Sequence, residues 1–111
     1  THGDLGGRHI LMDPERRVEG VIDFGKVCVG YRDRDFHPLL SNLGESFTRR
    51  ILAAYRHPDP DRVIAAGCFY GAVDSVDALL RGLEEGVDWK IRDGRNGMAN
   101  ALRVYANVRG E

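Results

Sequence analysis

Lysine and cysteine are scarce in this 111-residue chain, which has only Lys26, Lys90, Cys28 and Cys68. Without C-x-x-C spacing, the cysteines are expected to be small buried hydrophobes in a reducing cytosol. No apolar run approaches the roughly 18 residues of a membrane span, and no signal-peptide pattern is present. The formal charge of −1 gives no reason to expect a nucleic acid or an acidic membrane as partner. The sequence therefore predicts a cytoplasmic protein.

Two features of nucleotide-binding enzymes are also missing. There is no G-x-G-x-x-G loop, and no lysine in a strand of the V-A-I-K type. The glycines at 6–7 and 94–97 lack the strand-to-strand setting that a phosphate cradle needs. The chain also begins at Thr1 without an initiator Met. We therefore expect one domain or part of one, cut from a longer protein.

The N-terminal quarter carries the densest pattern of functional side chains. It opens with His2-x-Asp4, places His9 five residues after that aspartate, and closes on Ile-Asp23-Phe-Gly. Residues 9–13 and 18–24 are rich in aliphatic side chains, and the proline at 14 suits a type I turn between them. A β-hairpin brings residues far apart in sequence to the same end, so Asp4 and Asp23 are expected to meet.

Four helices are expected in the remainder. The first runs from 33 or 35 to 40 or 43, and the second from 46 to the prolines at 58 and 60. The third, capped by Asp59 or Asp61, extends to 85, and the fourth covers 91–107. The predicted class is α+β and mainly helical, with the hairpin lying across one end of a four-helix core.

The two last helices carry apolar positions at helical spacing. On the fourth, Met98, Leu102 and Tyr105 are expected on the inner side. The third carries a stripe spaced by four and three residues, which should pack against a partner. The stripe consists of Phe69, Val73, Val76, Leu80 and Leu83.

The motifs HGDLGGRHILMD and GVIDFG resemble those of the aminoglycoside phosphotransferase family, which has a protein-kinase-like fold. The segment GYRDRDF at 30–36 is similar to the G-D-P-x-x-D-L run of that family. The resemblance covers the whole chain but only the later part of a family member. It implies that residues 1–111 form the C-terminal lobe of a kinase-like phosphotransferase and that the N-terminal nucleotide-binding lobe is absent.

The resemblance also implies roles for five side chains. Asp4 would be the catalytic base and Asp23 the Mg²⁺ ligand. His9 stands where most members have an Asn that holds a second Mg²⁺; it either donates a hydrogen bond or loosens that metal site, and macrolide phosphotransferases also carry His here. His2 would brace the catalytic loop, as would Asp35, for which a simple helix cap is the alternative.

The implied activity is ATP-dependent phosphorylation of a hydroxyl on a small molecule, such as an aminoglycoside or macrolide antibiotic, in a bacterium. Mg²⁺ and ATP are the expected cofactor and co-substrate. In this family, acidic side chains of the C-terminal helices hold cationic acceptors, and a Trp could form a pocket wall. Candidates by location are Asp74, Asp77, Glu84, Glu85, Asp88 and Trp89.

Two other functions stay open. Tyr31 replaces the Asp of G-D-P, and with the missing lobe this favours a non-catalytic kinase-like binding module. His2, Asp4, His9 and Asp23 could instead form the site of a metal-dependent hydrolase. The isolated chain should show no appreciable turnover, and apolar surface near the hairpin could lead to self-association.

Overall fold

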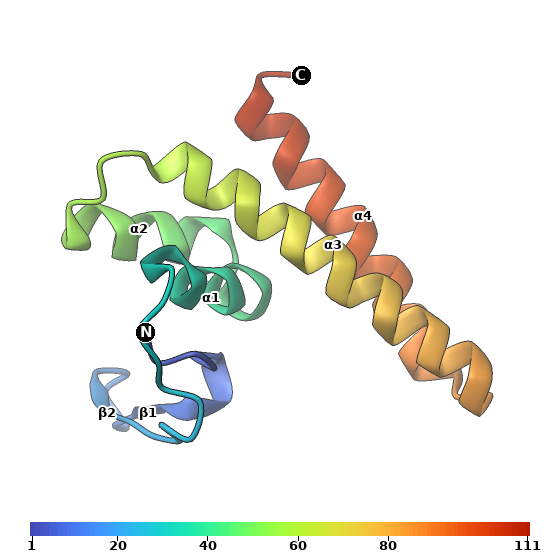
Figure 1. The fold of residues 1–111 in the computed structure, drawn as a ribbon, viewed down its shortest axis with the longest axis horizontal. Coiled ribbons are helices and arrows are strands. Elements are labelled where there is room, and N and C mark those ends of the chain that lie inside the picture. Colours follow the sequence, from blue (N-terminus) through green and yellow to red (C-terminus); the bar gives the residue numbers. More distant parts are fainter.

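The fold is mainly helical, with one two-stranded sheet at the N-terminal end (Figure 1). The computed structural model describes all 111 residues. Its elements are η1 (Gly7–His9), β1 (Ile10–Met12), β2 (Val18–Val21), η2 (Arg32–Asp35), α1 (Phe36–Leu43), α2 (Glu45–Tyr55), α3 (Pro60–Glu85) and α4 (Asp88–Arg109), where η marks a 3₁₀ turn. The predicted α+β, mainly helical class is confirmed.

The predicted hairpin forms, but it is shorter than the sequence indicated. The turn after Asp13 is closed by two hydrogen bonds, from Arg16 N to the Asp13 carbonyl (2.9 Å) and from Arg17 N to Asp13 Oδ1 (2.8 Å). β2 ends before Asp23, whose backbone has a φ of +62° and so leaves the extended conformation. The hairpin lies beyond α1 at one end of the molecule (Figure 1), where Ile10 packs against the core.

The start of α3 follows the predicted signal. Asp59 is its N-cap, and the side chain accepts a hydrogen bond from Arg62 N at 3.1 Å. Pro60 occupies the first turn, where a missing N–H has no helical partner to lose. Of the two caps predicted, Asp59 is therefore the one used.

Very small residues form the contact between α3 and α4, which run side by side as a helical hairpin (Figure 1). A Cβ added at Gly94 would lie 2.7 Å from the Ser75 carbonyl oxygen and 2.8 Å from Leu79 N. One added at Gly97 would lie 2.4 Å from Ser75 Oγ. Glycine therefore allows these two backbones to approach more closely than any side chain would permit. The fourth helix begins at Asp88 and not at 91 as predicted, and both glycines lie inside it.

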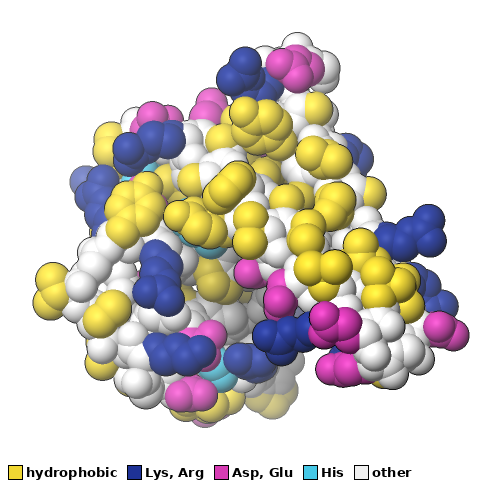
Figure 2. Space-filling model, turned by 45° about the vertical axis from the view of Figure 1, so that its right-hand side comes forward, with side chains coloured by type: hydrophobic (Ala, Val, Ile, Leu, Met, Phe, Trp, Pro, Cys, Tyr) yellow, Lys and Arg dark blue, Asp and Glu magenta, His cyan; other side chains and the backbone are white.

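The assignment of inner faces to these two helices was wrong for the stripe on α3 and for Leu102 on α4, whereas Met98 is half-buried. The stripe expected to pack is exposed, as Phe69 (64% exposed) and Leu80 (53%) illustrate. On α4, Leu102 is 60% exposed, while Ala101 and Val104 are buried. Figure 2 shows the hydrophobic side chains gathered over the region of α3 and α4. Close glycine packing turns the larger apolar side chains outward, so the stripe forms a surface of this chain.

By length and composition alone, α3 is long and apolar enough to cross a membrane, with 22% of the relevant window buried. The expectation that no segment reaches this threshold was therefore wrong. The helix packs along α4 and α1, and it carries Asp74 and Asp77 near its middle. Carboxylates at such positions are costly in hydrocarbon.

The core lies where α1, α2 and the first half of α3 meet the C-terminal half of α4. Its buried apolar residues are Phe36, Leu39, Leu40, Leu52, Val63, Ile64, Cys68, Ala101 and Val104. Cys68 is buried as expected, whereas Cys28 is exposed. His37 and His57 are both buried.

Candidate active site

Asp35 holds the loop that carries Asp4 through two hydrogen bonds to its backbone. The backbone N–H groups of His2 and Gly3 donate to the two carboxylate oxygens of Asp35, at 2.9 and 3.0 Å. Asp35 occupies the N-cap position of α1, but its side chain makes no cap hydrogen bond. Asp35 therefore binds the backbone of the loop in this structure and makes no hydrogen bond as a helix cap.

His2 links this loop to the end of the hairpin. Its Nδ1 accepts from Asp4 N (3.1 Å), so Nε2 carries the proton and donates to the Ile22 carbonyl at 2.8 Å. The ring packs on Phe24, with centroids 4.6 Å apart. Through this one buried imidazole, the segments that carry Asp4 and Asp23 are fixed relative to each other.

Gly3 allows the loop to cross the segment after the I-D-F-G motif. Its φ is +87°, and an added Cβ would lie 2.3 Å from the Lys26 carbonyl oxygen. Both the left-handed backbone and the close approach require glycine. The fold therefore gives a steric reason for the glycine at the second position of the H-G-D motif.

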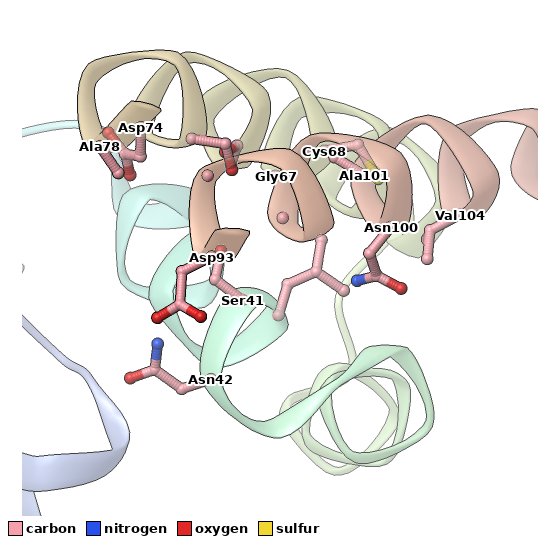
Figure 3. Close-up of a pocket in the computed structure, with 15 residues that line it drawn as sticks. Ser41, Asn42, Gly67, Cys68, Asp74, Ala78, Asp93, Asn100, Ala101 and Val104 are labelled. Atoms are coloured by element: carbon pink, nitrogen blue, oxygen red, sulfur yellow. The ribbon is translucent and has the colours of Figure 1, made fainter. Parts of the chain in front are cut away.

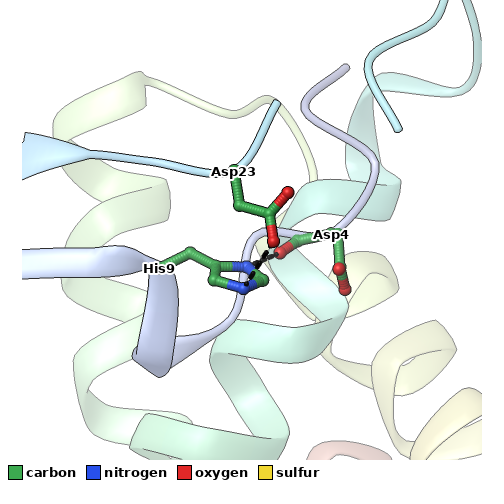
Figure 4. A group of neighbouring side chains, drawn as sticks. All are labelled: Asp4, His9 and Asp23. Atoms are coloured by element: carbon green, nitrogen blue, oxygen red, sulfur yellow. Dashed lines mark hydrogen bonds and ion pairs between the residues drawn. The ribbon is translucent and has the colours of Figure 1, made fainter. Parts of the chain in front are cut away.

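Asp4, His9 and Asp23 meet in one cluster (Figure 4). One possible ligand atom from each lies within 4.8 Å of the others. His9 Nε2 is 3.2 Å from Asp23 Oδ2, and His9 Nδ1 is 2.7 Å from the Asp4 carbonyl oxygen. The His9 ring is buried, while the Asp23 side chain is 59% exposed. The left-handed backbone of Asp23 is a local strain of the kind found at functional sites.

Two basic side chains flank the Asp4 carboxylate. Arg8 and Lys26 place nitrogens 3.7 and 3.8 Å from Asp4 Oδ2. Both side chains are well exposed, so solvent weakens these pairs and the side chains can move. Sequence analysis did not single out Lys26; its position directly after I-D-F-G is the signal that could have found it.

Asp33, within η2, is a fully buried carboxylate that fixes this turn to the residues around it. It accepts hydrogen bonds from Tyr31 Oη (2.8 Å), His57 Nε2 (2.8 Å) and Arg62 (3.3 Å). Burial alone raises the pKa of Asp33, but the hydrogen bonds from Tyr31 and His57 outweigh it and lower the pKa below its usual value. No spacing in the sequence marked Asp33, because its partners come from three separate segments.

Replacing Asp33 by Asn should flatten the acid limb of the stability profile. A lowered pKa in the folded state gives stability that is present above the unfolded pKa of about 3.9 and is lost as pH falls through the folded value. As the pH is lowered below about 4, the urea concentration at the unfolding midpoint should therefore decrease for the wild type. It should decrease less for Asp33→Asn. Urea titrations between pH 2 and 7, with exposed Asp77→Asn as control, measure this. Parallel slopes for Asp33→Asn and wild type would contradict the assignment.

A cavity of about 350 Å³ opens between α1, α3 and α4 (Figure 3). Asp74 and Asp93 both line it, and in Figure 3 Asp93 points toward Asn42. Asn42 Oδ1 accepts a hydrogen bond from Gly7 N at 2.8 Å. The cavity is therefore joined directly to the loop that carries Asp4.

A second cavity, of about 490 Å³, lies beside the loop that carries Asp4. Gly3 lines it, together with Arg34, His37, Tyr70 and Asp74. His37 stacks on Tyr70 with centroids 4.8 Å apart, and its buried Nε2 has no hydrogen-bond partner. Burial lowers the pKa of His37. Asp74 borders both cavities and is thus the acidic side chain shared between them.

A family model described as the phosphotransferase enzyme family matches residues 1–65. This match covers the whole loop-and-hairpin region and the first two helices. The chain belongs to this phosphotransferase family.

A curated relative supports the assignment over most of the chain. Viomycin phosphotransferase from Streptomyces vinaceus is 27% identical over 100 residues, which is 87% of this chain and 34% of the relative. The chain thus spans about a third of the length of that relative. No solved structure matches the chain significantly.

In this phosphotransferase family member, the proposed acceptor-binding residues fall into two groups. Asp74 borders the cavities next to the loop. Asp77, Glu84 and Trp89 border neither: Asp77 pairs with Arg81 at 3.0 Å, Glu84 is exposed, and Trp89 is 57% exposed with Lys90 near its ring. The structure does not bring these three toward Asp4.

Asp93 is the acidic cavity residue that sequence analysis missed. It lies one residue before Gly94 in α4. Once Gly94 is known to touch α3, Asp93 is expected at the edge of the contact, facing α1. That signal was hidden because the glycines in this segment made the start of the helix doubtful.

Proposed function

We propose that this chain is the C-terminal, helical lobe of a kinase-like, ATP-dependent phosphotransferase that acts on a hydroxyl group of a small molecule. The observation that carries the proposal is the meeting of Asp4 and Asp23 around His9, from positions far apart in the sequence. Phosphoryl transfer needs one carboxylate near the acceptor hydroxyl and another that holds a cation against the phosphates. Family membership supports the same reaction class.

In this proposal each loop residue has a distinct role. Asp4 orients the acceptor hydroxyl and takes its proton late, because positioning dominates this reaction. Asp23 and His9 hold the divalent cation, for which Mg²⁺ is the first expectation; when bound, the cation neutralises charge on the phosphates. His2 and Asp35 are positioning residues, since they touch the loop backbone and the hairpin. The exposed Lys26 and Arg8 lie where phosphate charge would enter the site.

The acceptor is proposed to approach through the two cavities that share Asp74. Asp74 and Asp93 supply negative charge there, which favours an acceptor with a cationic group. The relative is named for viomycin, and an antibiotic of that kind is the first acceptor to test. Residues outside this chain are proposed to contact the adenine and the α- and β-phosphates, so the isolated 111 residues should turn over little ATP. A bacterial cytoplasmic location and self-association through exposed apolar surface stay predictions.

Calorimetric titration of the full-length protein with Mg²⁺·ATP tests the proposal. Wild type should release heat and consume ATP in the presence of an acceptor, starting with viomycin and then other hydroxyl-bearing small molecules. Asp23→Asn should lose nucleotide binding at least about tenfold, because the amide cannot replace a charged metal ligand. Asn also tolerates the positive φ at this position, so the variant should fold.

Two results would contradict the proposal. No heat with Mg²⁺·ATP in the wild type would instead support a non-catalytic binding module. Tight stoichiometric Zn²⁺ that survives dialysis, together with hydrolysis in the absence of nucleotide, would support the metal-dependent hydrolase. Glu15→Gln, in the exposed hairpin turn, serves as a charge-matched control and should bind nucleotide like the wild type.

A further inference from the structure

The ring of His9 is oriented so that one nitrogen lone pair faces Asp23. A carbonyl oxygen can only accept a hydrogen bond, so His9 Nδ1, 2.7 Å from the Asp4 carbonyl, carries the proton. His9 Nε2 accepts a hydrogen bond from Arg8 Nε at 3.2 Å, so this nitrogen presents its lone pair. It also lies 3.2 Å from Asp23 Oδ2. Two acceptors that face each other at this distance are a natural place for a cation.

We propose that His9 gives this site a preference for a divalent first-row transition ion, such as Mn²⁺, over Mg²⁺. The inference rests on the proposed function and concerns which cation that same site selects. Mg²⁺ is a hard ion that prefers oxygen and gives up water reluctantly. Imidazole nitrogen favours transition ions, whose affinities rise from Mn²⁺ toward Zn²⁺. One nitrogen among the ligands therefore shifts the selectivity of an otherwise all-carboxylate site.

The geometry fits such a pair of ligands. Two neighbouring ligands on an octahedral ion, each about 2.1 Å from it, lie about 3 Å apart. The measured separation of 3.2 Å between His9 Nε2 and Asp23 Oδ2 is close to this value. The Asp4 ligand atom lies within 4.8 Å of both, near enough for a third contact through a water molecule.

The surroundings hold the nitrogen in place and leave the ion a path. The His9 side chain is about nine-tenths buried, and its Nδ1 bond fixes the ring. A hydrogen bond from the second ring nitrogen to a carbonyl oxygen is typical of metal-ligating histidines. Arg8, which now donates to Nε2, has a side chain that is 76% exposed. It can swing into solvent when an ion takes its place.

Titration of the 111-residue chain with Mn²⁺ alone, in a Cys28→Ser background that removes the exposed thiol, tests the inference. Electron paramagnetic resonance gives the Mn²⁺ affinity, and its pulsed form detects a ¹⁴N nucleus bound to the ion. Competition with Mg²⁺ gives the affinity ratio. Mn²⁺ should bind at least about tenfold more tightly than Mg²⁺ and should show an imidazole ¹⁴N coupling. His9→Asn should remove the coupling and lower the ratio about tenfold.

Controls separate this inference from the function proposed above. Glu15→Gln should keep both the ¹⁴N coupling and the affinity ratio. Asp23→Asn should weaken the binding of both Mn²⁺ and Mg²⁺. If Asp23→Asn abolishes binding but wild type shows no ¹⁴N coupling and a ratio near that of His9→Asn, the metal site stands and the His9 inference is overturned. If neither ion binds and the full-length protein also fails to bind Mg²⁺·ATP, the proposed function is contradicted as well. If His9→Asn does not fold, the presence or absence of the ¹⁴N coupling in the wild type still tests whether His9 binds the ion.

Discussion

Asp4→Asn in the full-length phosphotransferase should lower kcat by about 10²- to 10⁴-fold, the usual contribution of a positioned general base. Asparagine can still accept a hydrogen bond from the acceptor hydroxyl, but it cannot take the proton. The backbone of Asp4 should stay in place, because its N–H and carbonyl, and not its carboxylate, make the bonds to His2 and His9. Steady-state kinetics with Mg²⁺·ATP and the acceptor found by the screen measure the effect.

The comparison with Asp23→Asn makes this result specific. Affinity for Mg²⁺·ATP should change much less in Asp4→Asn than in Asp23→Asn, since only the second aspartate faces the His9 lone pair directly. The exposed Glu19→Gln, on β2, should leave both parameters unchanged. Equal loss of nucleotide affinity in Asp4→Asn and Asp23→Asn, with kcat preserved in the first, would remove Asp4 from the role of base.

Gly94→Ala should lower the free energy of unfolding by up to about 2 kcal/mol. Overpacking a closed contact costs about 1–3 kcal/mol, and the new Cβ would meet backbone atoms of Ser75 and Leu79, which cannot rotate away. The gain in helix propensity from Gly to Ala, about 1 kcal/mol, offsets only part of this cost. Urea unfolding followed by far-ultraviolet circular dichroism measures the change.

Two matched variants in α4 test whether the loss comes from close packing. Asn96→Ala, on the exposed side of the same helix, should be neutral or slightly stabilising. Gly97→Ala should be destabilising alone but tolerated with Ser75→Ala, because the closest atom there is the serine hydroxyl and the next lies at 3.4 Å. A Gly94→Ala protein as stable as the wild type would mean that α3 and α4 do not meet at these glycines.

The turn and pairing of the hairpin could be predicted well because these interactions are local in the chain. The strands around the turn after Asp13 and the cap at Asp59 depend on neighbouring residues and on dihedral preferences that those residues carry. The meeting of Asp4 with Asp23 follows from the hairpin between them. The position of Asp35 was left open between a local helix cap and a brace of the loop, because its bonds to His2 N and Gly3 N join segments far apart in the chain. Sequence patterns work where the partners lie within one supersecondary unit.

The packing of α3 on α4 could not be predicted in the same way. Hydrophobic periodicity placed Leu80 and Leu102 inside, since large apolar side chains usually define the buried face. In this fold, α3 and α4 touch where their backbones approach most closely, and the residues there are glycine and alanine and not large apolar residues. The buried Asp33 with His57, and the cavity residue Asp93, were missed for a related reason: the surroundings of each include segments far away in the sequence.

The sequence of the loop and hairpin by itself thus determined that Asp4 and Asp23 lie together, and the chain as a whole determined the α+β class, because both follow from short-range geometry. Three-dimensional packing selected which helix faces touch, which charges are buried and which acidic side chains border the cavities beside Asp4. These depend on sums of small contact energies between distant segments, and the close approach of Gly94 and Gly97 to Ser75 of α3 leaves no hydrophobic signal along the chain.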